Sequence, residues 1–210
     1  MPPKLVIATN NPGKLREFQQ LLNGCGFDLT TPRDLGVNFD PEETGATFSE
    51  NATLKAVDAS RSCGLVALAD DSGLEVDHLG GRPGISSARY AGGDRTDPNI
   101  NEARQLELLL DEMQGVPDAQ RTARFRCVIA IAQPGDANVQ LVDGVFEGRI
   151  AHEPRGTNGF GYDPIFVVNG RDLTSAELPP DEKNRISHRG AAAAKALVLL
   201  RKMSGDRTTA

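Results

Sequence analysis

The sequence predicts an α/β fold built around a mixed, twisted sheet with helices on its faces. Two short apolar runs, residues 4–8 and 65–69, have the length and composition of buried strands, and helix-like apolar periodicity follows the first of them. Apolar residues alternate strictly over 123–131, and a second strand is expected at 139–146 after a Pro-Gly-Asp turn, which together predict a hairpin. Since a hairpin adds antiparallel strands to a sheet of the α/β kind, the sheet should be mixed.

Composition limits the class of protein. The chain has 210 residues, enough for a core without structural metal or disulfides, and a net charge of −6 makes nucleic-acid binding by bulk electrostatics unfavourable. Its three cysteines form no CxxC pair and are expected as reduced thiols. No apolar run is long enough for a membrane span, and the amino terminus lacks a signal-peptide layout. We therefore expect a cytoplasmic protein that binds neither nucleic acid nor membrane.

The first strand leads into a loop and a helix that together predict an anion site. Asn11 is the expected N-cap with Pro12 at the first helical position, so free backbone N–H groups and the positive end of the helix dipole would face the loop. Lys14 opposes that dipole, which suggests that it serves something negative. The loop is not a Walker P-loop, because Leu15 follows Lys14. An ordinary helix cap with a solvated lysine is the alternative.

The next segment is expected to contain a short strand at 27–29, a loop at 32–43, and a helix over 47–61 that begins with a capping box. Asn51 and Lys55 lie one turn apart on that helix and could face a common ligand. A solvated helix face is the more frequent explanation of such a pair.

The reaction is expected at the tetrapeptide Asp70-Asp71-Ser72-Gly73, interpreted as a turn after the strand at 65–69. Carboxylates at the carboxyl end of a strand in an α/β sheet point toward the crevice where ligands bind, and Mg²⁺ prefers oxygen ligands. The alternative is that these four residues only form the turn, since Asp, Ser and Gly all favour turns. A brief strand at 74–76 should follow.

Further along, a Gly-rich loop is expected at 80–89, and a packing helix should begin at a cap formed by Thr96 or Asp97. A second glycine-laced loop at 156–164 places two aromatic residues between glycines, which suggests a stacking surface for a flat ring.

The last helix should begin at Ser187, so that His188 and Arg189 lie at its amino end, with Lys183 just before it. Cations there are unfavourable for the helix dipole, which points to a ligand, although each alone could be a surface charge. Residues 204–210 should form a disordered tail after a single domain over 1–203.

Six motifs occur together in this chain, nearly from end to end. They are Thr9-x-Asn11-x-x-Lys14, Thr47-Phe48-x-Glu50-Asn51-Ala52, Asp70-Asp71-Ser72-Gly73-Leu74, Gly80-Gly81-x-Pro83-Gly84, Phe160-Gly161-Tyr162-Asp163-Pro164 and Lys183-x-x-x-Ser187-His188-Arg189. In order and spacing they closely resemble the inosine triphosphate pyrophosphatase family, whose members hydrolyse non-standard purine nucleoside triphosphates such as ITP, dITP and XTP. The resemblance implies an elongated two-lobed fold with the active site in the cleft between the lobes, a homodimer, dependence on Mg²⁺, and release of a nucleoside monophosphate and pyrophosphate.

The resemblance also implies roles for individual residues. Glu42 and Asp71 would serve the metal, with the adjacent Glu43 as the alternative to Glu42, and Asp71 would be the proton acceptor. Substrate contacts are implied for Thr9, Asn10, Asn11, Pro12, Gly13, Lys14, Lys55, Ser72, Phe160, Gly161, Tyr162, Asp163, Lys183, His188 and Arg189.

Within that set, residues 9–14 and Lys55 would meet the phosphates, and the aromatic face at 160–162 would stack on the purine. N–H donors on His188 and Arg189 suit the 6-oxo group of hypoxanthine or xanthine and oppose the 6-amino group of adenine. A purine nucleotide sensor without turnover, or a sugar-nucleotide transferase with an acidic metal site, stays open as an alternative from the residues alone.

Overall fold

The computed structural model describes residues 1–92 and 98–205. Contacts divide the chain into two compact units. Unit 1 comprises Met1–Asp71, Cys127–Gly144 and His188–Ala210, and unit 2 comprises Ser72–Arg126 and Val145–Ser187. The caps expected at Thr96 or Asp97, and residues 206–210 of the expected tail, lie outside the described residues.

Six strands form one mixed sheet in the order β2-β1-β3-β4-β5-β6. β1 (Lys4–Ile7) pairs in parallel with β2 (Asp28–Thr30) and with β3 (Val66–Val76). β4 (Thr122–Ala132) lies between β3 and β5 (Gln140–Ile150), and β5 pairs antiparallel with β6 (Phe166–Val168). The predicted α/β class and mixed sheet are confirmed.

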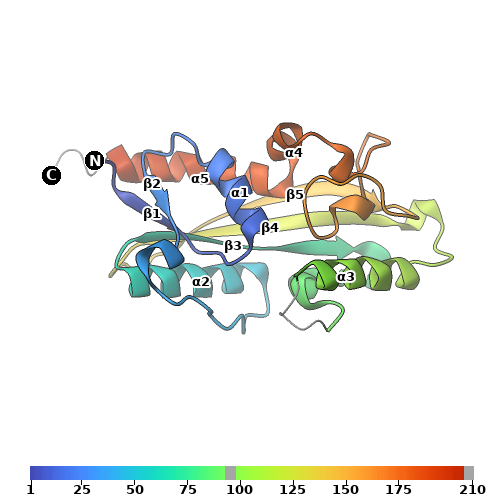
Figure 1. The fold of residues 1–210 in the computed structure, drawn as a ribbon, viewed down its shortest axis with the longest axis horizontal. Helices are drawn as coiled ribbons and strands as arrows, with labels where there is room; N and C mark the ends of the chain where they lie inside the picture. Colours follow the sequence, from blue (N-terminus) through green and yellow to red (C-terminus); the bar gives the residue numbers. More distant parts are fainter. Residues whose placement is uncertain (93–97, 206–210) are drawn as a thin grey trace. The chain divides into compact units, whose positions relative to one another are not determined.

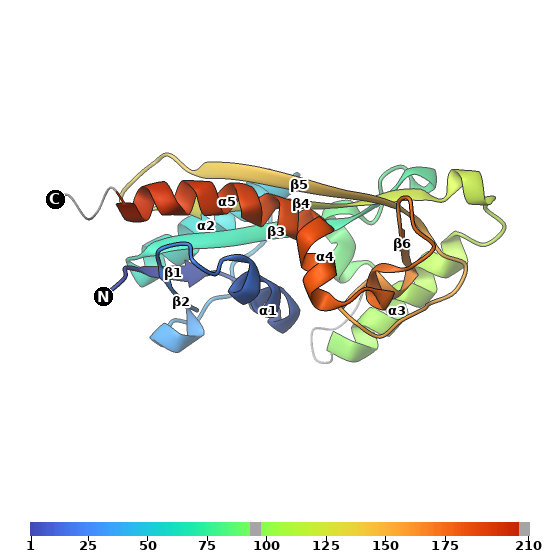
Figure 2. The same ribbon diagram turned by 90° about the horizontal axis from the view of Figure 1, so that it is seen from above.

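In unit 1, helices cover both faces of the sheet. α2 (Phe48–Cys63) lies on one face, and α1 (Pro12–Leu21) and α5 (His188–Gly205) lie on the other (Figures 1 and 2). Because side chains alternate along a strand, every second residue of β1, and of the parts of β3 and β4 that belong to unit 1, packs in one core with α1 and α5. These core residues include Leu5, Ile7, Phe18, Leu22, Val66, Leu68, Cys127, Ile129, Ala193, Ala196 and Leu200.

Unit 2 has its own core, in which α3 (Pro98–Glu112) packs beside the parts of β3, β4 and β5 that belong to this unit. Its members include Leu74, Val76, Leu109, Met113, Phe125, Phe146, Ile165, Phe166 and Leu178. A short helix, α4 (Pro180–Ile186), precedes α5 in the chain. Among the described residues, no helix combines the length and apolar character needed to cross a membrane.

The turn expected at 70–73 is wrong, because these residues continue β3 without interruption. β3 lies between β1 and β4, so sheet pairing outweighs the local turn preference of Asp, Ser and Gly. The aspartates nevertheless lie near the carboxyl end of a strand, as expected, but the strand is β1. β1 ends at Ile7, which is paired with Leu68, so Asp70 and Asp71 lie just beyond the carboxyl end of the parallel pair.

Several local predictions are confirmed. Asn11 caps α1, with Pro12 at its first position, and Thr47 caps α2. The three cysteines are free. The sequence analysis did not predict β6 or α4, and α5 continues through Gly205, past its expected end.

Candidate active site

In the loop between β1 and α1, side chains accept hydrogen bonds from the backbone N–H groups at the start of the helix. The Asn11 side-chain oxygen accepts hydrogen bonds from the backbone N–H groups of Gly13 (2.8 Å) and Lys14 (3.1 Å), and the Asn11 N–H donates to the Thr9 hydroxyl (3.1 Å). Pro12 has no N–H to offer. The expectation of free backbone donors at this helix end is therefore wrong, because an Asn cap uses the same groups that an anion would. The Lys14 ammonium is left as the main cationic group of the loop.

The two adjacent aspartates of β3 lie on opposite faces of the sheet, as the period of two in a strand requires. Asp71 faces α2. Its carboxylate accepts a hydrogen bond from the Lys55 ammonium (3.0 Å) and from the Asn51 amide (3.3 Å). The same ammonium contacts the Glu43 carboxylate at 2.7 Å. The common group expected for Asn51 and Lys55 is thus the Asp71 carboxylate, and Lys55 bridges it to Glu43.

Burial and the neighbouring charges shift the pKa values of Lys55 and Asp71 in opposite directions. Burial lowers the pKa of Lys55, but the carboxylates of Asp71, Asp70 and Glu43 outweigh it and hold that pKa above its ordinary value. Burial raises the pKa of the Asp71 carboxyl, and the ammonium groups of Lys55 and Lys14 offset only part of that rise. A buried carboxylate with a raised pKa is a better proton acceptor than a solvated one.

Asp70 faces the other side, toward α1 and α5, and its side chain is only 1% exposed. Its carboxylate lies 3.0 Å from the Lys14 ammonium and 3.3 Å from the Arg189 guanidinium. Arg189 also contacts Glu17 of α1 at 2.5 Å. Burial by itself raises the pKa of Asp70, but Lys14 and Arg189 outweigh it and hold the pKa well below its usual range. Burial lowers the pKa of Arg189, yet the two carboxylates keep it above its ordinary value.

The start of α5 is therefore buried, with His188 4% and Arg189 1% exposed. Both predicted contacts lie in unit 1 together with residues 9–14, Lys55 and Asp71. Arg189 is already shared between two carboxylates, so a contact to a purine base would be in addition to these pairs or in exchange for one of them.

In unit 2, the loop at 156–163 folds around the Asp163 carboxylate. Asp163 accepts hydrogen bonds from the Phe160 backbone N–H (2.9 Å) and from the Lys183 ammonium (2.5 Å). That ammonium lies 5.0 Å from the centre of the Phe160 ring, a cation–π geometry. Gly159 adopts a φ of +80°, and a side chain there would meet the Asp163 carboxylate, so the close approach requires glycine.

Of the two aromatic residues expected to form a stacking surface, only Phe160 is partly exposed. Tyr162 is 5% exposed, packs in the core of unit 2, and donates its hydroxyl to the Ser87 carbonyl at 2.9 Å. The stacking role expected for Tyr162 is therefore wrong, because its ring is used for packing. Ser72, which is half-buried, also belongs to unit 2.

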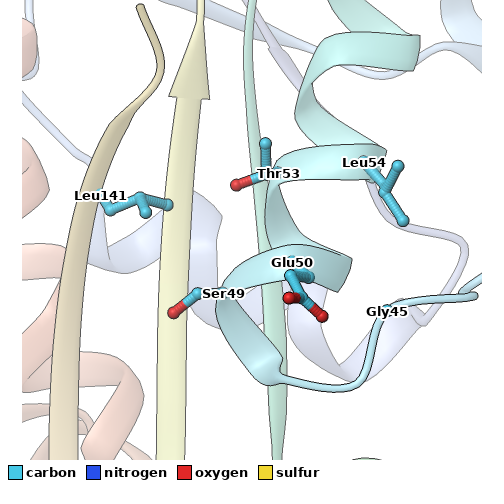
Figure 3. Close-up of a pocket in the computed structure, with 6 residues that line it drawn as sticks. All are labelled: Gly45, Ser49, Glu50, Thr53, Leu54 and Leu141. Atoms are coloured by element: carbon cyan, nitrogen blue, oxygen red, sulfur yellow. The ribbon is translucent and has the colours of Figure 1, made fainter.

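An open hollow of about 400 Å³ lies between the start of α2 and β5 (Figure 3). It is lined by Gly45, Ser49, Glu50, Thr53 and Leu54, and by Leu141 of β5. None of these is a predicted site residue, and Asn51 and Lys55 project from a different side of the same helix toward β3.

A family model described as the Ham1 family matches residues 5–199. The chain belongs to the Ham1 family. Among curated members, this Ham1-family chain is 50% identical to a dITP/XTP pyrophosphatase of Bacillus licheniformis over 197 residues, which covers 94% of the chain and 97% of that protein. It is 52% identical over 190 residues to a dITP/XTP pyrophosphatase of Escherichia coli K12, with 90% of the chain and 93% of that protein covered.

Solved structures agree with the fold. A HAM1 protein from Coxiella burnetii has a TM-score of 0.84 and 44% identity, with 95% of this chain and 99% of that chain covered. The Ham1 protein of Staphylococcus aureus has a TM-score of 0.81 and 40% identity, with the same coverage. The resemblance to a nucleoside triphosphate pyrophosphatase family expected from the six motifs is confirmed.

Sequence reasoning left the choice between Glu42 and Glu43 open. Glu42 is exposed, whereas the half-buried Glu43 contacts Lys55. The pairing of Glu17 with Arg189 was also missed, since the two are far apart in sequence. A helical spacing of three residues from Lys14 to Glu17 is the available signal, because it places both toward the same side of α1.

Proposed function

We propose that this Ham1-family protein hydrolyses non-standard purine nucleoside triphosphates, namely ITP, dITP and XTP, to the nucleoside monophosphate and pyrophosphate. The observation that carries the proposal is the Glu43–Lys55–Asp71 cluster at the carboxyl end of the parallel strands, with Asn51 on Asp71. Lys14, in the first turn of α1, contacts the adjacent Asp70. The names of the two curated relatives support the substrate class.

We further propose Mg²⁺ as the cofactor, held by Asp71 and Glu43 in place of Glu42. Among the described residues no group of three or more His, Cys, Asp or Glu side chains is arranged as a complete metal cage. Two carboxylates nevertheless fit this metal, because Mg²⁺ at phosphoryl-transfer sites uses one or two carboxylates together with waters and substrate phosphates. When bound, Mg²⁺ would withdraw charge from the phosphate oxygens.

The net charge of the ion-pair cluster in unit 1 supports Mg²⁺ as the cofactor. The ion pairs of the site contain three cations, Lys14, Lys55 and Arg189, against four carboxylates, Glu17, Glu43, Asp70 and Asp71. A triphosphate added to such a net negative cluster would be repelled. A divalent cation reverses the sign of the cluster.

The chain's own residues would then divide the reaction as follows. Asp71 accepts a proton from a water molecule whose oxygen attacks the α-phosphorus, while the bond from that phosphorus to the oxygen bridging to the β-phosphate breaks. The electron pair leaves with the bridging oxygen as pyrophosphate. Lys14 and Lys55 offset the negative charge that develops on the phosphate oxygens. No covalent enzyme intermediate is needed.

Unit 2 would hold the nucleoside. The partly exposed ring of Phe160 offers a face for the purine, and the Lys183 ammonium lies beside that ring. In unit 1, the donors of His188 and Arg189 are candidates for the 6-oxo group. A site built around this hydrogen bond rejects adenine, because its own polar groups would be left unpaired.

The test is incubation of the purified protein with Mg²⁺ and a panel of nucleoside triphosphates, followed by phosphorus NMR. ITP, dITP and XTP should yield monophosphate and pyrophosphate, and ATP should be a poor substrate. Orthophosphate and a diphosphate as first products would contradict the proposal. Binding of ITP without product would instead favour a nucleotide sensor.

We also propose a cytoplasmic homodimer. Three free cysteines suit a reducing compartment. Exposed apolar side chains on unit 1, including Leu54, Val57 and Leu141, offer surface that a second copy could cover. Light scattering after gel filtration measures the mass, and a monomer at micromolar concentration would contradict the dimer.

A further inference from the structure

One fully buried carboxylate of unit 1 has no role in the proposed chemistry. Asp70 lies on the opposite face of β3 from Asp71 and Lys55, and one of its oxygens receives both the Lys14 ammonium at 3.0 Å and the Arg189 guanidinium at 3.3 Å. A buried charge is unfavourable unless it is paired, so this aspartate is kept charged by its two cations. Its contact with Lys14 places it beside the first turn of α1.

Lys14 needs such a partner. It lies in the first turn of α1, where the helix dipole disfavours a cation, and its own N–H is already used by the Asn11 cap. A lysine side chain has four rotatable bonds, so without a fixed contact its ammonium would sample many positions. The Asp70 contact therefore restricts the ammonium to one place at the end of β1.

Arg189 differs from Lys14 in how much it depends on Asp70. It has a second carboxylate, Glu17, at 2.5 Å, so it keeps a buried partner when Asp70 is removed. Lys14 is the cation whose location is set by Asp70.

We propose that Asp70 is a positioning residue for the pyrophosphatase reaction, which acts by holding the Lys14 ammonium where the phosphates bind. The inference rests on the proposed function, and specifically on Lys14 as a phosphate contact. Asp70 touches neither phosphate nor metal in this role. Its contribution passes through Lys14 alone.

A double-mutant cycle with ITP as substrate tests the proposal. Asp70→Asn should lower kcat/KM by about tenfold or more, and Lys14→Met by at least as much. The double variant should be no worse than Lys14→Met, since the aspartate has nothing left to position. A loss caused only by weakened structure would instead add to the effect of Lys14→Met.

The matched control is Asp143→Asn, which removes the exposed carboxylate that pairs with Lys195 outside the site and leaves Lys14 paired. It should change kcat/KM by less than about threefold. The proposal is overturned if the effects of Asp70→Asn and Lys14→Met multiply in the double variant. It is equally overturned if the effect of Asp70→Asn disappears in an Arg189→Ala background, because the aspartate would then act through Arg189.

The experiment also distinguishes an unstable Asp70→Asn variant from a failure of the proposed function. If Asp70→Asn melts below the assay temperature, Asp70→Glu replaces it, which keeps the charge but shifts the carboxylate by one methylene, and the same coupling to Lys14→Met is expected. If the wild-type protein does not release pyrophosphate from ITP, or Lys14→Met leaves kcat/KM unchanged, the proposed function or the role of Lys14 has failed. In either case the cycle then also rejects Asp70 as a positioning residue.

Discussion

Replacing Lys55 by methionine should make the protein bind a divalent cation more tightly when no nucleotide is present. The Lys55 ammonium lies between the two carboxylates proposed as metal ligands, 2.7 Å from Glu43 and 3.0 Å from Asp71. A cation that enters this place must displace it. Lys55→Met keeps most of the side-chain volume and removes the competing charge.

The magnitude follows from the two contacts. A hydrogen bond between charged groups contributes about 1.5–3 kcal/mol, so freeing the ammonium from both carboxylates costs about 3–6 kcal/mol. Roughly half of this should be regained as the ammonium moves into water. The remaining 1.5–3 kcal/mol corresponds to a dissociation constant roughly tenfold to a hundredfold lower in the variant.

Titration with Mn²⁺, followed by electron paramagnetic resonance, measures this constant without turnover. The control is Lys195→Met. Lys195 of α5 forms an exposed pair with Asp143 of β5, so its removal should change the Mn²⁺ dissociation constant less than about twofold. Hydrolysis of ITP by Lys55→Met should fall while its metal affinity rises. A folded Lys55→Met protein with the wild-type Mn²⁺ constant would refute the reasoning, since the ammonium would then not occupy the cation's place.

Three other changes have definite expectations. Asp71→Asn should retain the fold, as checked by circular dichroism, and lose about a hundredfold or more in kcat, because it removes the proton acceptor and one metal ligand; a near wild-type rate would disprove that assignment. Arg189→Ala should lower kcat/KM for ITP about tenfold more than for ATP. An unchanged ratio, together with a lower melting temperature, would leave Arg189 as a partner of Glu17 and Asp70 only. Arg121→Met should cost about 3 kcal/mol or more in urea unfolding, because this buried guanidinium donates to the carbonyls of Met113, Ile150 and Ala151. The exposed-pair control Arg124→Met should cost less than about 1 kcal/mol.

Local signals in the sequence predicted the elements whose cause is local. The caps at Asn11 and Thr47 were predictable because a side chain satisfies backbone donors two or three residues away. The alternation over 123–131 was predictable because one face of β4 is buried throughout. The uninterrupted course of β3 was not, since Asp70–Gly73 has turn chemistry and only its neighbours in the sheet make it a strand.

The site shows the same division. Asp71, Lys14 and Lys55 were identified by residue type, spacing and resemblance. The choice between Glu42 and Glu43 was not available from sequence, because the loop before α2 has no period that fixes which side chain turns inward. The contact of Glu43 with Lys55 is the observation that favours Glu43 in our proposal. Likewise, no local pattern reveals that Tyr162 packs inward while Phe160, two residues earlier, stays partly exposed.

The opposite orientation of Asp70 and Asp71 also affects how relatives should be aligned with this chain. The two residues are chemically identical and adjacent, so an alignment that shifts this pair by one position still places an aspartate opposite an aspartate. It would nevertheless assign the proposed proton-acceptor role to the carboxylate that pairs with Lys14 of α1 and Arg189 of α5, and not to the carboxylate that contacts Lys55 of α2. Residue roles should therefore be transferred through this motif only when the alignment also matches the face of β3 on which each aspartate lies. The buried Val66 and Leu68 mark the face that carries Asp70.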